Sequence, residues 1–330
     1  MEPSAAPISI ADLHRAAERI AGRAVRTPLL AAPALDELTG GRVLLKCETL
    51  QRTGSFKFRG AYNALAALDR IERERGVVAV SSGNHAQGVA EAARLFGVKA
   101  TIVMPADAPA IKRQRTERSG ARVVTYDRAS EDRDAVAARI LAEAGGTLVH
   151  PYNDPLVIAG QGTIGLEIAA DARAIGLVPD AVLIPCGGGG LSAGVGLAVR
   201  DAFREAEILL VEPEGFDDYG RSLREGAIAA NPTTAGSVCD ALLAPSPGPI
   251  GLVINRLNGA SGQVVRDDEA LAAVAFAFRE LKLVVEPGGA VGLALLLARR
   301  AEFHGRAVVI VLSGGNLDEA MLGRALAATP

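Results

Sequence analysis

Residues 181–194 read AVLIPCGGGGLSAG, and the order of residue types in this stretch decides the fold. The apolar residues at 181–185 predict a buried strand, and the four glycines at 187–190 lead into a helical segment. Four adjacent glycines lose much backbone entropy on ordering, so they must bring some other advantage. Their N–H groups could wrap a phosphate at close range, whereas close packing of helix on strand explains one such glycine but hardly four.

The same order of strand, polar glycine turn and helix occurs at two more places in the chain. Residues 77–80 lead into SSGNH at 81–85, and residues 307–312 lead into SGGN at 313–316. Free N–H groups and the helix dipole favour an anion at such turns. Ligands of open α/β sheets bind at the carboxyl ends of strands, so these turns predict one site approached from several strands.

Short Val/Ile-rich segments alternate with Ala-rich helical segments along the whole chain, which predicts an α/β protein with parallel sheets. Eight strands are more than one small sheet usually holds, so we expect two sheets. The Pro-, Ser- and Gly-rich stretch at 227–251 is expected to be an ordered loop over the site. The predicted strands are 43–47, 77–80, 100–104, 122–125, 147–150, 181–185, 208–211 and 307–312.

Composition excludes several classes of function. The 330 residues carry a net charge of −3, so nucleic acid is not an expected partner. Arg113, Arg115 and Arg118 lie close together in the sequence, and we expect them on a solvated helix face. The three cysteines lack metal-ligand spacing, and no apolar run is long enough to cross a membrane. With no signal-peptide pattern in the first residues, a cytoplasmic protein without membrane contact is expected.

The stretch GSFKFRG at 54–60 places Lys57 between two phenylalanines in a turn bracketed by glycines. A lysine usually lays its stem on apolar surface and keeps its charge in water. Aromatic neighbours and a tight backbone indicate a pocket instead. A lysine in a pocket has a lowered pKa and can act as a nucleophile or form a Schiff base.

The glycine-rich turn also permits a different interpretation. Gly188, Gly190 and Ala193 match the G-x-G-x-x-A dinucleotide fingerprint, and Glu212 lies near the position of a ribose-binding acid. An NAD-dependent oxidoreductase is therefore an alternative. It leaves the Lys57 turn and the other two glycine turns unexplained, so the sequence favours it less.

Taken together, these features resemble the pyridoxal-phosphate (PLP) enzymes of fold type II, in the serine/threonine dehydratase and serine racemase branch. The family has two open, twisted, parallel sheets flanked by helices, with the active site in a cleft between two domains. The resemblance implies a large domain at 1–52 and 150–330 and a small domain at 53–149, without a C-terminal regulatory domain. The matching stretches are TGSFKFRGAYNAL, SSGNHAQGVA, VIAGQGTIGLEI, PCGGGGLSAG, VEPGGAVGLA and LSGGNLD.

The resemblance also assigns roles to residues. Lys57 would hold the cofactor aldehyde as a Schiff base and act as the catalytic base, with Phe56 beside the cofactor ring. Asn84 would bind the ring hydroxyl, and Ser313 would meet the pyridine nitrogen. The phosphate would bind at Gly187, Gly188, Gly189, Gly190 and Leu191, and the substrate carboxylate at Ser81, Ser82, Gly83, Asn84 and His85.

A serine at the pyridine nitrogen makes the ring a weaker electron sink than an aspartate would, which suits β-elimination. The family therefore implies an ammonia-lyase (dehydratase) that converts L-threonine or L-serine into a 2-oxo acid and ammonia. A serine racemase or a threo-3-hydroxyaspartate dehydratase on the same scaffold is the alternative. Ser82 is either a second acid/base opposite Lys57, as in the racemases, or a small polar loop residue.

Further expectations rest on the same resemblance. Glu212, Phe216 and Asp218 match the divalent-cation site of the racemases, and their oxygen ligands imply Mg²⁺ or Ca²⁺; two surface acids on a loop is the alternative. A homodimer acting on a small-molecule amino-acid substrate is expected. Ala241 adds a methyl group near the expected cofactor plane, and Glu286 is expected near the active site.

Overall fold

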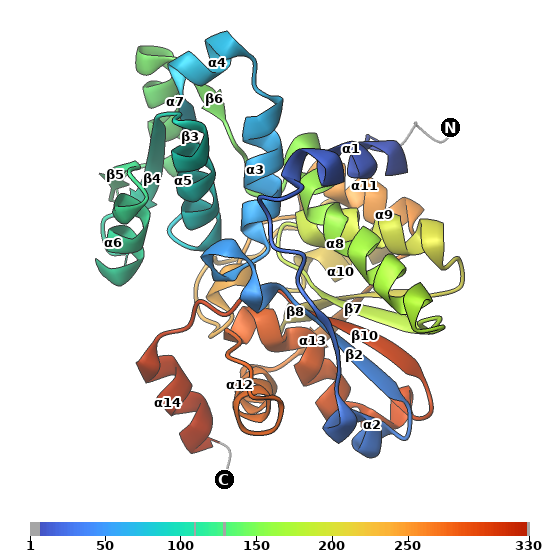
Figure 1. The fold of residues 1–330 in the computed structure, drawn as a ribbon. Helices are drawn as coiled ribbons and strands as arrows, with labels where there is room; N and C mark the ends of the chain where they lie inside the picture. Colours follow the sequence, from blue (N-terminus) through green and yellow to red (C-terminus); the bar gives the residue numbers. More distant parts are fainter. Residues whose placement is uncertain (1–6, 109, 128–129, 329–330) are drawn as a thin grey trace.

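A computed structural model describes residues 7–108, 110–127 and 130–328. It contains two sheets, a six-stranded one of order β1-β2-β10-β7-β8-β9 and a four-stranded one of order β5-β4-β3-β6 (Figure 1). Among the described strands every pairing is parallel except that of β1 with β2. The strands are β1 (Leu29–Ala31), β2 (Arg42–Cys47), β3 (Val77–Val80), β4 (Ala100–Pro105), β5 (Arg122–Tyr126), β6 (Thr147–Leu148), β7 (Ala181–Pro185), β8 (Glu207–Pro213), β9 (Ser261–Val265) and β10 (Ala307–Leu312).

Helices cover both sheets, and their order along the chain alternates with that of the strands, as the sequence predicts. The helices are α1 (Ile10–Ile20), α2 (Pro33–Thr39), α3 (Lys57–Ala67), α4 (Arg70–Arg75), α5 (Asn84–Phe96), α6 (Ala110–Arg118), α7 (Arg133–Ala144), α8 (Pro155–Ala174), α9 (Gly190–Ala202), α10 (Asp218–Glu225), α11 (Pro249–Leu257), α12 (Asp267–Phe276), α13 (Pro287–Ala298) and α14 (Glu319–Ala328). None of the described helices is long and apolar enough to cross a membrane.

The six-stranded sheet is buried on both faces, and β10 shows why its sequence is continuously apolar. Val308, Ile310 and Leu312 belong to the core formed with α12 and α13. Val309 and Val311 point the other way, into the core formed with α8 and α9. Successive side chains of a strand alternate between faces, so a strand covered on both sides needs an apolar residue at every position.

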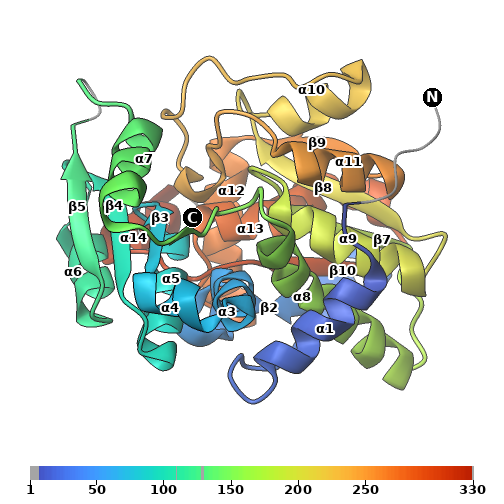
Figure 2. The ribbon, with the colours of Figure 1, turned by 90° about the horizontal axis from the view of Figure 1, so that it is seen from above.

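The four-stranded sheet is built in the same way. Val77 and Ala79 of β3 pack in the core with α3 and α5, whereas Val78 packs with Val136 and Ala137 of α7. In the view from above, this sheet and its helices lie on one side of the molecule, and α8, α9 and α1 lie on the other (Figure 2).

All eight predicted strands are present, and all of their ends lie within two residues of the predicted ones. The strand predicted at 147–150 is shorter, because only Thr147 and Leu148 pair with β3. β1 and β9 lie at the edges of the six-stranded sheet and were not predicted.

Candidate functional site

The carboxyl ends of strands from both sheets open on one cavity of about 820 Å³. β2, β10 and β7 are parallel neighbours, so the turns that follow them share an edge of the sheet. The Lys57 turn joins this edge directly: Phe56 N donates to Ser313 O at 3.1 Å, and Ser55 pairs with Gly314. The cavity brings together all the residues predicted for cofactor and substrate, namely Phe56, Lys57, Ser81, Ser82, Gly83, Asn84, His85, Gly187, Gly188, Gly189, Gly190, Leu191 and Ser313.

Lys57 is the first residue of α3 and lines the cavity. Its Nζ donates to the carbonyl oxygen of Pro151 at 2.8 Å and lies 5.1 Å from the ring centroid of Phe56. Burial disfavours the ammonium form and lowers the pKa of Lys57 to about 8. The structure thus supplies the pocketed amine, close to neutrality, that a Schiff base requires.

The turn after β3 presents the N-terminus of α5 to the cavity. Asn84 is the first residue of this helix, so the N–H groups of its first turn have no partner within the helix. His85 is buried, and its Nε2 contacts Val149 O at 2.8 Å. Burial and the nearby charges of Lys57 and His150 lower the pKa of His85 to about 3, so its ring is neutral. A helix N-terminus of this kind favours a bound carboxylate.

The four glycines after β7 form a tight loop at the N-terminus of α9. A Cβ at Gly188 would lie 2.2 Å from the ring of Tyr152, and one at Gly189 would lie 2.1 Å from the ring of Tyr219. Gly189 also has a φ of +86°, which L side chains rarely adopt. Cβ atoms at Gly187 and Gly190 would come within 3.1 Å of other residues as well.

All four glycines therefore meet protein atoms, but these atoms belong to Tyr152, Gln161, Tyr219 and Leu242 and not to β7, so packing of helix on strand is not what requires four glycines. The loop nevertheless leaves its N–H groups beside the cavity at a helix N-terminus, which fits a phosphate.

Asn84 is held by two residues that adjoin elements of the six-stranded half: Glu286 precedes α13, and Asn316 lies in the turn after β10. Its Nδ2 donates to Oε1 of Glu286 at 2.6 Å, and its Oδ1 accepts from Nδ2 of Asn316 at 2.8 Å. Asn316 Nδ2 also donates to Thr53 O, beside the Lys57 turn. Glu286 lines the cavity as expected, and its contact with Asn84 gives it a role that the sequence left open.

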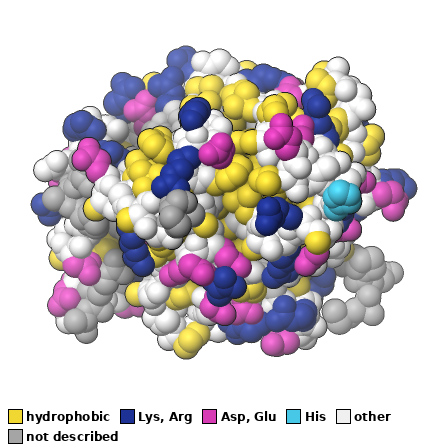
Figure 3. All heavy atoms as spheres, turned by 90° about the horizontal axis from the view of Figure 1, so that it is seen from below, with side chains coloured by type: hydrophobic (Ala, Val, Ile, Leu, Met, Phe, Trp, Pro, Cys, Tyr) yellow, Lys and Arg dark blue, Asp and Glu magenta, His cyan; other side chains and the backbone are white. Residues whose placement is uncertain are grey.

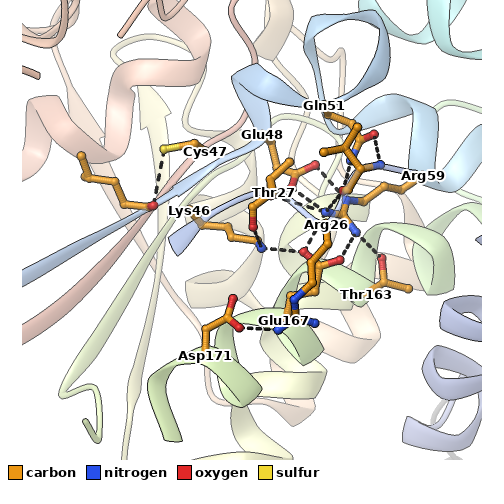
Figure 4. A network of polar contacts seen from close by, with 12 residues as sticks. Arg26, Thr27, Lys46, Cys47, Glu48, Gln51, Arg59, Thr163, Glu167 and Asp171 are labelled. Carbon is orange, nitrogen blue, oxygen red and sulfur yellow. Dashed lines mark hydrogen bonds and ion pairs between the residues drawn. The ribbon is translucent and has the colours of Figure 1, made fainter. Parts of the chain in front are cut away.

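Arg59, two residues after Lys57 in the chain, belongs to a buried charge cluster with Lys46, Glu48 and Glu167 (Figure 4). Arg59 is fully buried and donates to both carboxylates, at 2.8 Å to each oxygen of Glu48 and at 2.7 and 2.9 Å to those of Glu167. Lys46 donates to Glu167 and to the carbonyl oxygen of Thr27. The two positive and two negative charges compensate one another, and the ion pairs fix the first turn of α3 to β2 and α8.

Glu212 and Asp218 do not line the cavity, but both are fully buried near the N-terminus of α10. Glu212 accepts from the N–H groups of Tyr219 and Gly220, each at 2.8 Å. Asp218 accepts from Asn231 through one oxygen, and its other oxygen has no partner among the described residues. Burial raises the pKa of Glu212 to about 8 and that of Asp218 to about 6. The interpretation as surface acids was therefore wrong.

The same geometry counts against the NAD alternative, because the carboxylate of Glu212 is enclosed and already bonded to backbone N–H groups. The cavity instead offers an amine for an aldehyde and a glycine loop for a phosphate, which together fit PLP.

The chain belongs to the family of pyridoxal-phosphate dependent enzymes, whose model matches residues 20–314. It is 44% identical over 307 residues to an L-threo-3-hydroxyaspartate ammonia-lyase of Pseudomonas sp, covering 93% of this chain and 95% of that protein. A threonine deaminase structure from T.th. has a TM-score of 0.90 and 44% identity, covering 94% of this chain and 99% of that one. The maize serine racemase structure has a TM-score of 0.90 and 36% identity, covering 98% of each chain. The predicted family, two-sheet fold and cofactor are confirmed, and the NAD alternative is overturned.

Proposed function

We propose that the protein is a PLP-dependent ammonia-lyase, which eliminates water from L-threonine or L-serine to give a 2-oxo acid and ammonia. The observation that carries the proposal is the amine of Lys57, which burial brings close to neutrality in the same cavity as the glycine loop and the N-terminus of α5. The names of the similar proteins support the same reaction class.

When bound, PLP supplies an electron sink for the pair left at the substrate's α-carbon. The loop at 81–85 holds the substrate carboxylate at the N-terminus of α5. Lys57 takes the α-proton. Because its pKa lies near the working pH, a good fraction of the side chain is a neutral amine, and this amine is still basic enough to remove the proton. Ser313 is buried directly after β10 and would meet the pyridine nitrogen of PLP with a hydroxyl in place of a carboxylate, which suits elimination of the β-hydroxyl.

The test uses purified protein reconstituted with PLP. Borohydride should fix the cofactor to Lys57, and L-threonine or L-serine should yield equal amounts of 2-oxo acid and ammonia. Lys57→Ala should abolish both the covalent adduct and turnover. A protein that binds PLP through another residue, or a Lys57→Ala variant with full turnover, would overturn the proposal.

The observation that favours a second activity, serine racemisation, is that Ser82 lines the same cavity as Lys57. Two proton-handling groups on opposite faces of a substrate permit inversion of its α-carbon. D-serine formed from L-serine, and lost in Ser82→Ala while keto acid formation continues, would establish it. Turnover of threo-3-hydroxyaspartate, the other alternative, belongs in the same substrate panel.

We further propose that Glu212, Asp218 and the carbonyl of Phe216 bind Mg²⁺ or Ca²⁺. Two fully buried carboxylates with raised pKa values support this, because a hard cation would compensate both. Among the described residues no group of three acids, histidines or cysteines is close enough to bind a metal, so backbone carbonyls and water must complete the shell. Either cation should raise the melting temperature of chelator-treated protein, and Glu212→Gln should remove the effect.

A homodimer is proposed as well. On the side where α12 and α14 lie, hydrophobic side chains gather in the middle of the surface, with charged side chains around them (Figure 3). Phe278 and Val284, which follow α12 in the chain, are 41% and 46% exposed. Light scattering during gel filtration measures the molecular mass in solution, which should be twice that of one chain.

The division into domains at 1–52 with 150–330 and at 53–149 agrees with the two sheets and stays a proposal. We also propose a cytoplasmic location, which the three free, buried cysteines support.

A further inference from the structure

Three arginines line the cavity in addition to the groups used above: Arg115 of α6, Arg133 of α7 and Arg324 of α14. The first two belong to helices of the four-stranded sheet, which also carries the loop at 81–85. A serine or threonine substrate has a single carboxylate, and that loop accounts for it. Arg115 therefore calls for an explanation of its own.

Arg115 differs from the other arginines of its helix. Arg113 and Arg118 are exposed, as expected of a solvated face, whereas Arg115 is partly buried at the cavity wall and Thr116 beside it is buried. The prediction that the three arginines share a solvated face was therefore wrong for Arg115. α6 follows β4, so Arg115 lies in the second turn from the carboxyl edge of the sheet.

Arg115 has no hydrogen bond or ion pair with any residue that the structure describes. Two acidic side chains that line the same cavity, Asp267 and Glu286, already accept hydrogen bonds from other residues. A guanidinium stays charged at all accessible pH values, and its partial burial without a counter-charge costs free energy. Its planar fork matches a carboxylate through two parallel hydrogen bonds.

We propose that Arg115 forms a second anion subsite, which binds the side-chain carboxylate of an acidic β-hydroxy amino acid such as 3-hydroxyaspartate. The inference rests on the proposed function and specifies its substrate class. The reaction is the same elimination: one water leaves, one water enters when the imine hydrolyses, and a 2-oxo dicarboxylic acid and ammonia result.

The experiment compares kcat/KM for L-threo-3-hydroxyaspartate and L-serine in the PLP-loaded protein and its variants. We expect the wild type to prefer the acidic substrate, and Arg115→Met to lower the ratio of the two kcat/KM values about 100-fold, mainly through KM. Arg115→Lys should lower the ratio less, because it keeps the charge but loses the fork. Arg113→Met is the matched control, with the same charge change on an exposed position of the same helix, and should leave the ratio within about twofold.

The subsite is refuted if the wild type prefers L-serine, if the ratio does not change in Arg115→Met, or if both substrates lose equally. Equal losses would place Arg115 at the α-carboxylate instead. A measurement without turnover separates this inference from the proposed reaction. Succinate should raise the melting temperature of the wild type more than propionate does, and Arg115→Met should remove that difference even if no substrate reacts. An unchanged difference would overturn the subsite.

Discussion

Replacing Arg59 by methionine should destabilise the protein strongly, because Arg59 neutralises two buried carboxylates at once. Arg59 and Glu48 are fully buried, and Glu167 is only 14% exposed. The wild-type cluster has two cations and two anions, so Arg59→Met leaves Glu48 and Glu167 with Lys46 alone. Loss of one partner of a buried ion pair typically costs about 3–5 kcal/mol, since the remaining charge stays desolvated.

Urea unfolding of the cofactor-free protein measures this loss. Arg70→Met is the matched control: its ion pair with Glu74 lies along a single helix, and the two side chains are 81% and 62% exposed. That variant should lose at most about 0.5 kcal/mol. The double variant Arg59→Met/Glu48→Met removes a whole pair and should recover much of the loss. A loss below about 1 kcal/mol in Arg59→Met, or a double variant as unstable as the sum of its parts, would refute the reasoning.

The pH dependence gives a second check on the same cluster. Burial alone would raise the pKa of Glu167, but hydrogen bonds and charge from Arg59 and Lys46 hold it below the ordinary value of 4.5. A lowered folded-state pKa contributes stability above the unfolded value and loses it as the pH falls. The difference in stability between wild type and Arg59→Met should therefore shrink below about pH 4.5.

Three more predictions concern the cavity. Gly188→Ala should lower the free energy of unfolding by about 1–3 kcal/mol and weaken PLP binding, because the added Cβ overlaps the Tyr152 ring. The control Gly323→Ala lies in open space on α14 and should raise the free energy of unfolding by about 0.5–1 kcal/mol. Urea unfolding compares the two variants. Glu286→Ala should weaken PLP binding about tenfold by removing the acceptor of the Asn84 Nδ2 group, and Glu286→Gln should retain most of the affinity in fluorescence titrations. The rate of PLP addition to the cofactor-free protein should rise with pH around a midpoint of about 8, because the neutral amine of Lys57 is the reacting form; a midpoint near 10.5 would contradict the buried environment.

Sequence patterns located the strands of the buried sheets because these strands are apolar at nearly every position. β9 escaped prediction because it reads SGQVV, and β1 because it has only three residues. The turns that form the cavity were also predictable, since glycine and polar residues follow apolar runs at fixed places. The buried charge cluster was not, because Arg59 and Glu167 are 108 residues apart and a charged residue in a sequence is normally assigned to the surface.

The same limit applies to Arg115 and Glu286. Which arginine of a charged helix faces a cavity depends on how the helix is docked, and which acid meets Asn84 depends on how two sheets face each other. Neither follows from local spacing.

The crossing of α3 with its neighbours has a mechanical consequence. Cβ atoms at Gly60 and Gly160 would lie within 2.7 Å of the opposite backbone, so α3 and α8 touch along their main chains, and Arg59 adds ion pairs to this contact. A Cβ at Gly88 of α5 would lie farther away, 3.1 Å from the Lys57 backbone, and α3 shares an apolar core with α5. The helix that carries the reactive amine is therefore fixed to both halves of the molecule, to α8 through main-chain contact and ion pairs and to α5 through a shared apolar core.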